Sequence, residues 1–377
     1  MKKIIIISDN DPKDKQARSG VIYSIYNQLS KYNDTIWIKP QFNAVEYCIY
    51  KILKGIVKIL NCKGYGVTNH NPFFSKIICH AINRKIKDID YDAIFSFDCI
   101  NIAYLDTNKP IYYRSDSLYH LLINYYMQNT PTIFIKWGDI VEQKALQKIT
   151  TMFAPSRWII EGIKKYYPTT DLNKIKFIES GANIQNELIP NLTKSYDDIK
   201  VLNMLFIGFD LKRKGIDIAY QTLQILNSKY KINSTLTIIG GIPENNILND
   251  KRVNYLGKLN KNNPEQAKVF YKAFEQASLF IFPTKAEFHG IVNCEACAFS
   301  LPIFSYDTGG VSSYVLNNLN GNLLPINATA VDFAKKISEA FINNKLKEYS
   351  LNARNLYKTK FNWDVWGEKT NKIINHL

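Results

Sequence analysis

Two glutamates separated by seven residues are the strongest candidates for chemistry in this chain of 377 residues. Glu287 follows an apolar run typical of a strand, and Glu295 lies on a helical pattern that opens near Gly290. Both carboxylates are then expected at the ligand end of a parallel sheet, where they can accept hydrogen bonds from sugar or ribose hydroxyls. The N–H groups at the start of the same helix can bind a phosphate. The alternative is a strand, loop and helix with two incidental acids.

Three consecutive cations mark a second place in the same half of the chain. Lys212, Arg213 and Lys214 follow a strand-like run that ends at Gly208, at the start of the next predicted helix. The backbone of a helix start already favours an anion, and three cations there suit a diphosphate leaving group. A solvated run of charge is the alternative.

The sequence lacks the motifs of several common nucleotide-binding and metal-binding sites. Neither half has G-x-G-x-x-G after its first strand, and G-x-x-x-x-G-K-[ST] is absent, which disfavours dinucleotide oxidoreductases and P-loop NTPases. Cys294 and Cys297 form one C-x-x-C without a second pair, so we interpret them as core or interface residues rather than zinc ligands. No metal site is expected.

The elements that must position these residues alternate short β-branched runs with longer amphipathic patterns, which predicts parallel, doubly wound sheets. In the first half we expect strands at 3–7, 35–38, 92–97, 110–113, 151–154 and 175–179, and helices near 19–32, 43–61, 134–148 and 156–165. A polar linker at 189–200 follows. Beyond it we expect strands at 201–208, 235–241, 253–257, 279–283 and 301–305, and helices near 214–228, 264–276 and 290–299.

The length favours two domains that share a cleft. We expect an α/β fold with one Rossmann-like domain over 1–190 and a second over 198–360. A last amphipathic helix, within 361–377, is expected to pack back on the first domain. Two such sheets facing one another bind ligands at the carboxyl ends of their strands.

Composition and charge limit the location and the partners. The hydrophobic content of 46% and charged content of 21% are those of a folded globular protein. Six scattered cysteines fit a reducing cytoplasm better than a disulfide framework. The first apolar run is five residues long and meets Asp9, so it is typical of a strand rather than a signal peptide. Nowhere do 18 uncharged apolar residues follow one another, so no transmembrane helix is expected.

The formal net charge of +15 implies an acidic partner. Residues 39–87 hold nine basic side chains against Glu46 alone. In the helical pattern over 43–61, one narrow stripe carries Lys51, Lys54 and Lys58. This helix either packs with a thin solvated edge or lies on anionic lipid. No nucleic-acid-binding motif accompanies the charge, so nucleic acid is not expected as a partner.

The chain resembles the retaining glycosyltransferases of family 4, which adopt the GT-B fold. The specific part of the resemblance comprises Glu287, Gly290, Glu295, Leu301-Pro302, Thr308-Gly309-Gly310, Gly208 and Lys214-Gly215. Shorter matches extend it over nearly the whole chain: Ser19-Gly20, Ser115-Asp116-Ser117, Ser156 to Trp158, Gly181-Ala182-Asn183, Gly240-Gly241 and Phe361-Asn362-Trp363. Two positions depart from the family: Phe209 stands where it often has arginine, and His289 where it usually has phenylalanine.

The resemblance implies a role for each residue of the second domain. Glu295 would bind the nucleotide ribose, Glu287 the hydroxyls of the donor sugar, and Lys214 the phosphates. Sugar and diphosphate would also meet the backbone of His289, Gly290, Ile291 and Val292. From its position, Arg213 is expected to bind the phosphate that the family's arginine would otherwise bind. The side chain of His289 either touches the sugar or packs.

The first domain contributes two candidates. Gly20 lets the backbone approach the diphosphate closely because it has no Cβ, although an ordinary glycine at a helix start is the alternative. Asp116 follows a strand and either binds a donor hydroxyl or the acceptor nucleophile, or caps a helix. The family often has histidine near this position.

The implied activity is that of a metal-independent hexosyltransferase. It would move a sugar with retention from a nucleotide diphosphate sugar to a glycan, glycolipid or protein acceptor, in bacterial-type surface glycan or glycolipid synthesis. Lys214, Glu287 and Asp116 would be its catalytic residues, with no cofactor besides the donor. It would be cytoplasmic, or peripheral on the inner face of the membrane through residues 39–87. A nucleotide-sugar epimerase of similar fold and a non-catalytic nucleotide- or glycan-binding module are the alternatives.

Overall fold

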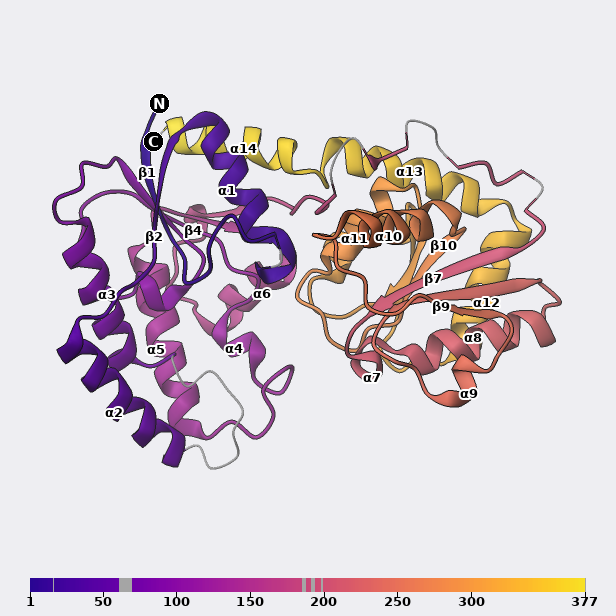
Figure 1. Cartoon of the computed structure of the whole chain (residues 1–377), viewed down its shortest axis with the longest axis horizontal. Coiled ribbons are helices and arrows are strands. Elements are labelled where there is room, and N and C mark those ends of the chain that lie inside the picture. The colour runs from indigo at the N-terminus through magenta and orange to yellow at the C-terminus, as the bar shows by residue number, and fades with distance from the viewer. Residues whose placement is uncertain (16, 61–69, 185–187, 191–193, 198, 377) are drawn as a thin grey trace. The chain divides into compact units, whose positions relative to one another are not determined.

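The computed structural model describes residues 1–15, 17–60, 70–184, 188–190, 194–197 and 199–376 (Figure 1). The chain forms two compact units: the first is Met1–Ile178 with Gly367–Leu377, and the second is Glu179–Trp366. Asn61, the predicted end of the helix over 43–61, lies outside the described residues, as does the rest of 61–69. The same holds for 191–193 and 198 in the predicted linker.

The first unit is built on a six-stranded parallel sheet of order β2-β1-β3-β4-β5-β6. Its strands are β1 (Lys3–Ile7), β2 (Asp34–Ile38), β3 (Ala93–Ser96), β4 (Ile111–Tyr113), β5 (Thr151–Ala154) and β6 (Ile175–Phe177). The run from Ile4 to Ile7 is fully buried, because helices cover both faces of such a sheet. Each strand predicted for this half is present, with its ends within two residues of the prediction.

Seven helices accompany this sheet in the described residues: α1 (Val21–Tyr32), α2 (Ala44–Leu60), α3 (Pro72–Ile86), α4 (Tyr119–Leu122), α5 (Thr132–Lys148), α6 (Arg157–Tyr166) and the C-terminal part of α14 (Trp363–His376). Helix α14 begins in the second unit and ends in the first. Its end is held by Lys2 Nζ, which donates to the Ile374 carbonyl at 2.6 Å, and by the Tyr112 hydroxyl, which donates to the same carbonyl at 3.3 Å. Residues 367–376 therefore complete the first unit.

The second unit contains another six-stranded parallel sheet, of order β12-β11-β10-β7-β8-β9. Its strands are β7 (Leu202–Gly208), β8 (Ser234–Gly240), β9 (Val253–Tyr255), β10 (Leu279–Phe282), β11 (Ile303–Tyr306) and β12 (Gly321–Leu324). One face packs on α10 (Pro264–Gln276), α11 (Ile291–Ala298) and α13 (Lys345–Thr359). The other packs on α8 (Ile216–Ser228) and α12 (Ala330–Ile342). Two one-turn helices, α7 (Leu211–Lys214) and α9 (Asn245–Leu248), follow β7 and β8.

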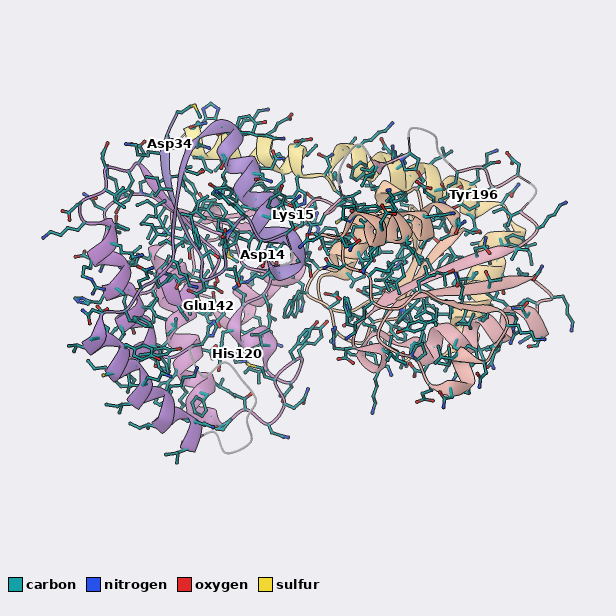
Figure 2. All side chains as sticks on the ribbon, viewed as in Figure 1. Asp14, Lys15, Asp34, His120, Glu142 and Tyr196 are labelled. Atoms are coloured by element: carbon teal, nitrogen blue, oxygen red, sulfur yellow. The ribbon has the colours of Figure 1, made fainter. Side chains whose placement is uncertain are left out.

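The described part of the linker is anchored to the second unit. The Tyr196 side chain, labelled in Figure 2, is buried, and its hydroxyl donates to the Ser278 carbonyl at 2.7 Å. Asp197 pairs with Lys347 on α13 at 2.9 Å. Residues 196 and 197 of the predicted linker are therefore attached to the second unit.

Each sheet reverses its strand order at one place. In the first sheet, β1 lies beside β3, and in the second, β7 lies beside β10, although neither pair is consecutive in sequence. Chain connections leave such neighbours in opposite directions, and open α/β sheets bind ligands at the carboxyl ends of these strands. In the second unit, the segments that follow β7 and β10 carry Lys214 and Glu287.

Candidate active site

Glycines shape the segment that presents Lys214. A Cβ at Gly208, the last residue of β7, would lie 2.9 Å from the Lys214 side chain, so glycine lets that lysine cross the end of the strand. Gly215 has a φ of +78° and separates α7 from α8. A Cβ there would meet the Pro283 carbonyl oxygen at 2.1 Å. The helix predicted from about Lys214 to Ser228 is present as α8 but begins at Ile216, because Gly215 separates it from α7, in which Lys214 is the last residue.

Lys214 and Glu287 form a partly buried ion pair. Lys214 Nζ donates a hydrogen bond to Glu287 Oε2, and each side chain is only 14% exposed. The same Nζ lies 4.6 Å from the centre of the Phe282 ring. Burial lowers the pKa of Lys214, an effect that Glu287 partly offsets. The sequence predicted both residues at this edge, and the structure brings their charged groups into contact.

Backbone contacts join the segments that carry this pair. Arg213 Nη1 donates to the Ala286 carbonyl at 2.8 Å, and the Lys285 N–H donates to the Arg213 carbonyl, also at 2.8 Å. From the turn after β11, the Gly310 N–H donates to the Glu287 carbonyl at 3.3 Å. The segments that follow β7, β10 and β11 thus hold Glu287 in place. The Thr308-Gly309-Gly310 turn contributes the hydrogen bond from Gly310. The Arg213 guanidinium lies at the same edge of the sheet, as the sequence predicted.

Helix α11 opens where the sequence predicted. Gly290 precedes it with a φ of +69° and no side-chain cap, so Ile291 and Val292 form an uncapped first turn. In that turn Asn293 is fully buried, and neither polar atom of its amide has a partner in the described part of the chain. Buried amides normally have hydrogen-bond partners, so this one is a candidate ligand contact. The sequence analysis did not select Asn293.

Glu295 is paired as well, with a residue that the sequence analysis missed. Lys261 Nζ donates to Glu295 Oε1 at 2.5 Å, and the glutamate is 2% exposed. Burial raises the pKa of Glu295, and Lys261 counteracts this rise. Both glutamates of the motif are therefore paired with a lysine ammonium.

The imidazole of His289 packs rather than lying open. The residue is 6% exposed, and its ring centre is 5.8 Å from that of Tyr314. Beside the site, two apolar side chains are exposed at the carboxyl ends of β7 and β8: Phe209 at 65% and Ile242 at 76%. The Gly241 N–H donates to the Gly208 carbonyl at 2.9 Å and keeps the two segments together. An exposed phenyl ring here offers a flat apolar surface to a ligand.

In the first unit, Gly20 ends an unusual backbone segment. Arg18, Ser19 and Gly20 have φ values of 48°, 57° and 85°, and α1 begins directly afterwards. Left-handed backbone is costly for residues other than glycine and persists only where the surroundings hold it. Arg18 is held by Asp98, which accepts from its guanidinium at 2.6 and 2.8 Å. This pair joins the segments that follow β1 and β3, where the strand order reverses.

Asp116 is an ion-paired carboxylate rather than a helix cap. It accepts a hydrogen bond from the guanidinium of Arg114, a residue that is 1% exposed. The next helix, α4, begins at Tyr119 with Leu118 in the cap position. The capping alternative for Asp116 is therefore wrong, and the carboxylate has a buried guanidinium as its partner after the end of β4.

The buried carboxyl of Glu142, labelled in Figure 2, lies between α5 and α4. It accepts from the Tyr113 hydroxyl at 3.1 Å and from the Tyr119 N–H at 3.0 Å. Burial raises the pKa of Glu142 to about 7. Its contacts are internal to the fold, so we assign it a structural role.

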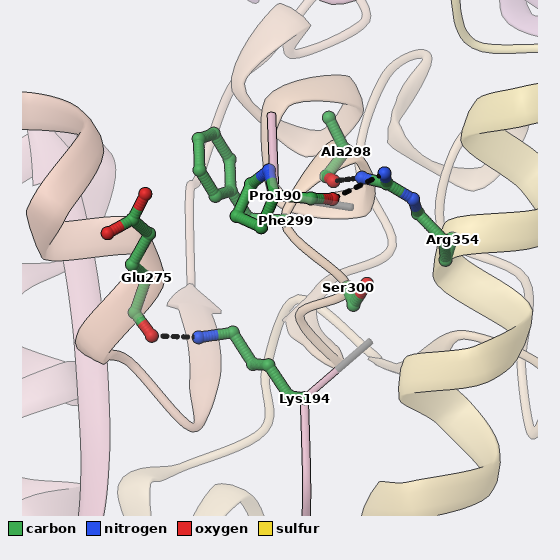
Figure 3. Close-up of a pocket in the computed structure, with 7 residues that line it drawn as sticks. All are labelled: Pro190, Lys194, Glu275, Ala298, Phe299, Ser300 and Arg354. Atoms are coloured by element: carbon green, nitrogen blue, oxygen red, sulfur yellow. Dashed lines mark hydrogen bonds between the residues drawn. The ribbon is translucent and has the colours of Figure 1, made fainter. Parts of the chain in front are cut away.

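A pocket of about 350 Å³ in the second unit lies among residues that the sequence did not select (Figure 3). Its two cations cap helices. Lys194 donates to the last carbonyls of α10, and Arg354 donates to the Ala298 carbonyl at the end of α11 and to that of Pro190 at 2.7 Å. Cations at helix C-termini stabilise the helix. Burial lowers the pKa of Lys194 to about 8.

Comparison with known proteins finds a family match for part of the chain, within the second unit. Residues 195–356 match the model of the family described as glycosyl transferases group 1. An uncharacterised glycosyltransferase of Methanocaldococcus jannaschii is 23% identical over 222 residues, 56% of this chain and 62% of the relative. The capsular polysaccharide biosynthesis glycosyltransferase CapM of Staphylococcus aureus is 25% identical over 236 residues, 58% of this chain and 60% of CapM. The chain thus spans about three fifths of the length of these curated relatives.

Solved structures cover the whole chain. A glycosyltransferase from Rickettsia africae matches 100% of this chain and 98% of its own, with a TM-score of 0.67 and 17% identity. Anabaena HepE in complex with UDP-glucose matches 100% of both chains, with a TM-score of 0.64 and 13% identity. The fold is therefore GT-B, with two Rossmann-like units, as the sequence predicts.

Proposed function

We propose that this chain is a retaining hexosyltransferase of glycosyltransferase family 4, acting on a nucleotide diphosphate sugar and an acceptor hydroxyl. The observation that carries the proposal is that each glutamate of the motif holds a lysine at the carboxyl edge of the second sheet. The family match over 195–356 and the similarity to CapM support it.

Donor binding would use both lysine–glutamate pairs. The diphosphate would meet the Lys214 ammonium, the Arg213 guanidinium and the uncapped N–H groups of α11. Ribose hydroxyls would donate to Glu295 and sugar hydroxyls to Glu287. The buried Asn293 amide would gain the partner that it lacks within the described residues. The HepE complex with UDP-glucose, which has the same fold, supports a nucleotide-sugar ligand.

The reaction would break the bond between the anomeric carbon and the phosphate oxygen. Negative charge then develops on the departing diphosphate, where Lys214, Arg213 and the α11 dipole stabilise it. The acceptor hydroxyl attacks the anomeric carbon from the same face and gives its proton to the leaving phosphate oxygen, so that configuration is retained. We assign no protein nucleophile. Because these cations supply the charge that a divalent metal would otherwise bring, we expect transfer to continue in excess chelator.

The first unit would bind the acceptor, with Asp116 as a hydrogen-bond acceptor for a hydroxyl. Its ion pair with the buried Arg114 holds the carboxylate in a fixed place after the end of β4. The similarity to CapM supports synthesis of a surface polysaccharide or glycolipid. We further propose that the protein works in the cytoplasm, because the described cysteines are all free thiols.

A panel of uridine, guanosine and thymidine diphosphate sugars tests this proposal by thermal shift and by nucleotide release without an added acceptor. We expect one nucleotide class to stabilise the protein and to be hydrolysed slowly, because water replaces the acceptor. Glu287→Gln serves as the control and should retain the thermal shift. An epimerase would convert the sugar without releasing nucleotide, and a binding module would give a thermal shift alone. A panel without any thermal shift would contradict the proposal.

A further inference from the structure

Helix α2 exposes an apolar stripe. Five side chains on it are between 45% and 73% exposed: Val45, Ile49, Ile52, Ile56 and Ile59. At 3.6 residues per turn they lie within an arc of about 80°. Soluble proteins rarely expose a contiguous apolar surface of this kind without a partner.

An adjoining face of α2 makes the contacts that hold the helix in the fold. Tyr50 and Leu53 pack against the buried Phe74 and Phe134 of α3 and α5. The ring centres of Tyr50 and Phe74 are 5.0 Å apart. Glu46, also buried, pairs with Arg84 at the end of α3. The exposed stripe is therefore not needed to hold α2 in the fold.

The charge on the remaining exposed face of α2 has one sign. Lys51, Lys54 and Lys58 are exposed along a second stripe, and Lys51 Nζ lies 5.2 Å from the centre of the Tyr47 ring. The acid on this helix, Glu46, is buried and neutralised by Arg84. By sequence, residues 39–87 carry nine basic side chains and no second acid. Helix α2 is thus apolar on one exposed side and positive on the side roughly opposite, as in helices that lie in a membrane interface.

We infer that α2 is a docking helix that lies flat on an anionic lipid bilayer. The apolar stripe would enter the boundary between head groups and acyl chains. From the other side of the helix, the long lysine side chains would extend to the phosphates of anionic lipids. Among the described helices, none combines the length and the apolar character needed to cross a bilayer, so the contact is with its surface. A second copy of the chain fits less well, because each chain carries a formal net charge of +15 and would repel another copy.

Vesicle co-sedimentation with the full chain tests this inference directly. Neutral vesicles are made of phosphatidylcholine, and anionic vesicles of phosphatidylcholine and phosphatidylglycerol in equal parts. We expect recovery with anionic vesicles at low salt, little with neutral ones, and release as salt is raised. Equal recovery with both kinds of vesicle, or with neither, overturns the inference. Binding to vesicles needs neither donor nor acceptor, so its outcome is separate from that of the proposed function.

Paired variants separate the two stripes. Ile52→Ser with Ile56→Ser removes apolar surface at little cost in helix propensity and should weaken binding at least tenfold. Lys51→Gln with Lys58→Gln should weaken it by roughly fivefold for each lysine. Helix α12 provides controls in exposed β-branched apolar residues and exposed lysines: Val331→Ser with Ile342→Ser, and Lys335→Gln with Lys336→Gln. Unchanged binding in both α2 variants, or equal losses in the controls, overturns the inference.

Cys48 provides a second measurement, at the edge of the apolar stripe. It is exposed, whereas the other described cysteines are buried. Cys62 lies outside the described residues and is replaced by serine in the labelled protein. A polarity-sensitive fluorophore on Cys48 should shift to the blue with anionic vesicles and stay unchanged with neutral ones. A blue shift that instead follows protein concentration without lipid, together with a dimer in sedimentation velocity, would assign this face to a second copy.

Discussion

Lys261 donates a hydrogen bond to Glu295 at 2.5 Å, although 34 positions of sequence separate them. The carboxylate is 2% exposed, while the lysine side chain keeps 32% of its surface in solvent. The proposed function gives the same carboxylate to the ribose of the donor. Lys261 therefore neutralises Glu295 in the free protein, and a bound nucleotide would share or replace that contact.

Lys261→Ala should lower the stability of the nucleotide-free protein and increase the thermal shift that nucleotide causes. Removing one partner of a buried pair costs about 3–5 kcal/mol, and the partial exposure of Lys261 reduces this to about 1–3 kcal/mol. Ribose hydroxyls would then stabilise the unpaired Glu295, so the thermal shift caused by nucleotide should increase. Lys268→Ala, at an exposed lysine on α10, is the control. A smaller nucleotide shift in Lys261→Ala would refute this relationship.

Lys214→Ala should lower turnover by roughly ten- to a thousand-fold, which is the range for losing one group that stabilises developing charge. Nucleotide release at saturating donor is the measurement. Lys212→Ala removes a neighbouring exposed lysine and should leave turnover within about twofold, since exposed charges are screened. Activity of Lys214→Ala near that of the wild type would remove this lysine from the mechanism.

The two glutamates should differ in the step that each supports. Glu287→Gln is expected to lower kcat more than nucleotide affinity, because its carboxylate faces Lys214 and the sugar. Glu295→Gln should mainly weaken nucleotide binding, by roughly tenfold for a charged hydrogen bond. Calorimetric titration with the nucleotide, beside steady-state kinetics, distinguishes them. The reverse pattern would exchange the two roles.

Gly215→Ala should be much more harmful than Gly257→Ala. Both glycines have left-handed backbone, with φ of +78° and +74°. At Gly257 a Cβ meets nothing within 4 Å, so only the backbone cost of about 1–2 kcal/mol applies. At Gly215 the Cβ would collide with the Pro283 carbonyl and displace Lys214. We expect an additional loss of stability and of turnover there, measured by thermal unfolding and nucleotide release. Equal effects in the two variants would contradict the collision.

Glu142 should make the stability of the protein depend on pH. Burial raises its pKa to about 7, above the value of ~4.3 in an unfolded chain. The folded state therefore holds the proton more tightly, and stability falls as pH rises between these two values, by about 3 kcal/mol. Glu142→Gln keeps partners for the Tyr113 hydroxyl and the Tyr119 N–H but has no proton to lose. Urea unfolding of both proteins at pH 4.5 and pH 8 should show a smaller decline in the variant. Parallel curves would exclude this carboxyl as the source.

The strands were predictable because both faces of each parallel sheet are covered, which leaves continuous apolar runs such as Ile4 to Ile7. Helices α3, α12 and α13 and strand β12 are absent from the sequence prediction. Two of them have local start signals: Asn71 caps α3 before Pro72, and Thr329 forms a capping box with Asp332 at α12. Strand β12 has no apolar alternation, and Gly321 packs directly on the Ile303 carbonyl.

The candidate site was predictable where its residues share a short segment. The spacing of Glu287 and Glu295 and the position of Lys214 after a strand locate the ligand edge. Lys261 was not predictable, because it lies in a polar loop whose distance from Glu295 is set only by the folding of α10 against α11. Asn293 was missed because a single asparagine on a buried helix has no spacing signal.

Helix α14 gives the order of synthesis a physical consequence. Because residues 367–376 supply part of the first unit, residues 1–178 can complete their packing only after the C-terminal helix has been translated. The second unit, residues 179–366, therefore has its whole sequence available while the first unit still lacks its last segment. A deletion at the carboxyl end of α14 would consequently damage the half of the protein encoded at the opposite end of the gene.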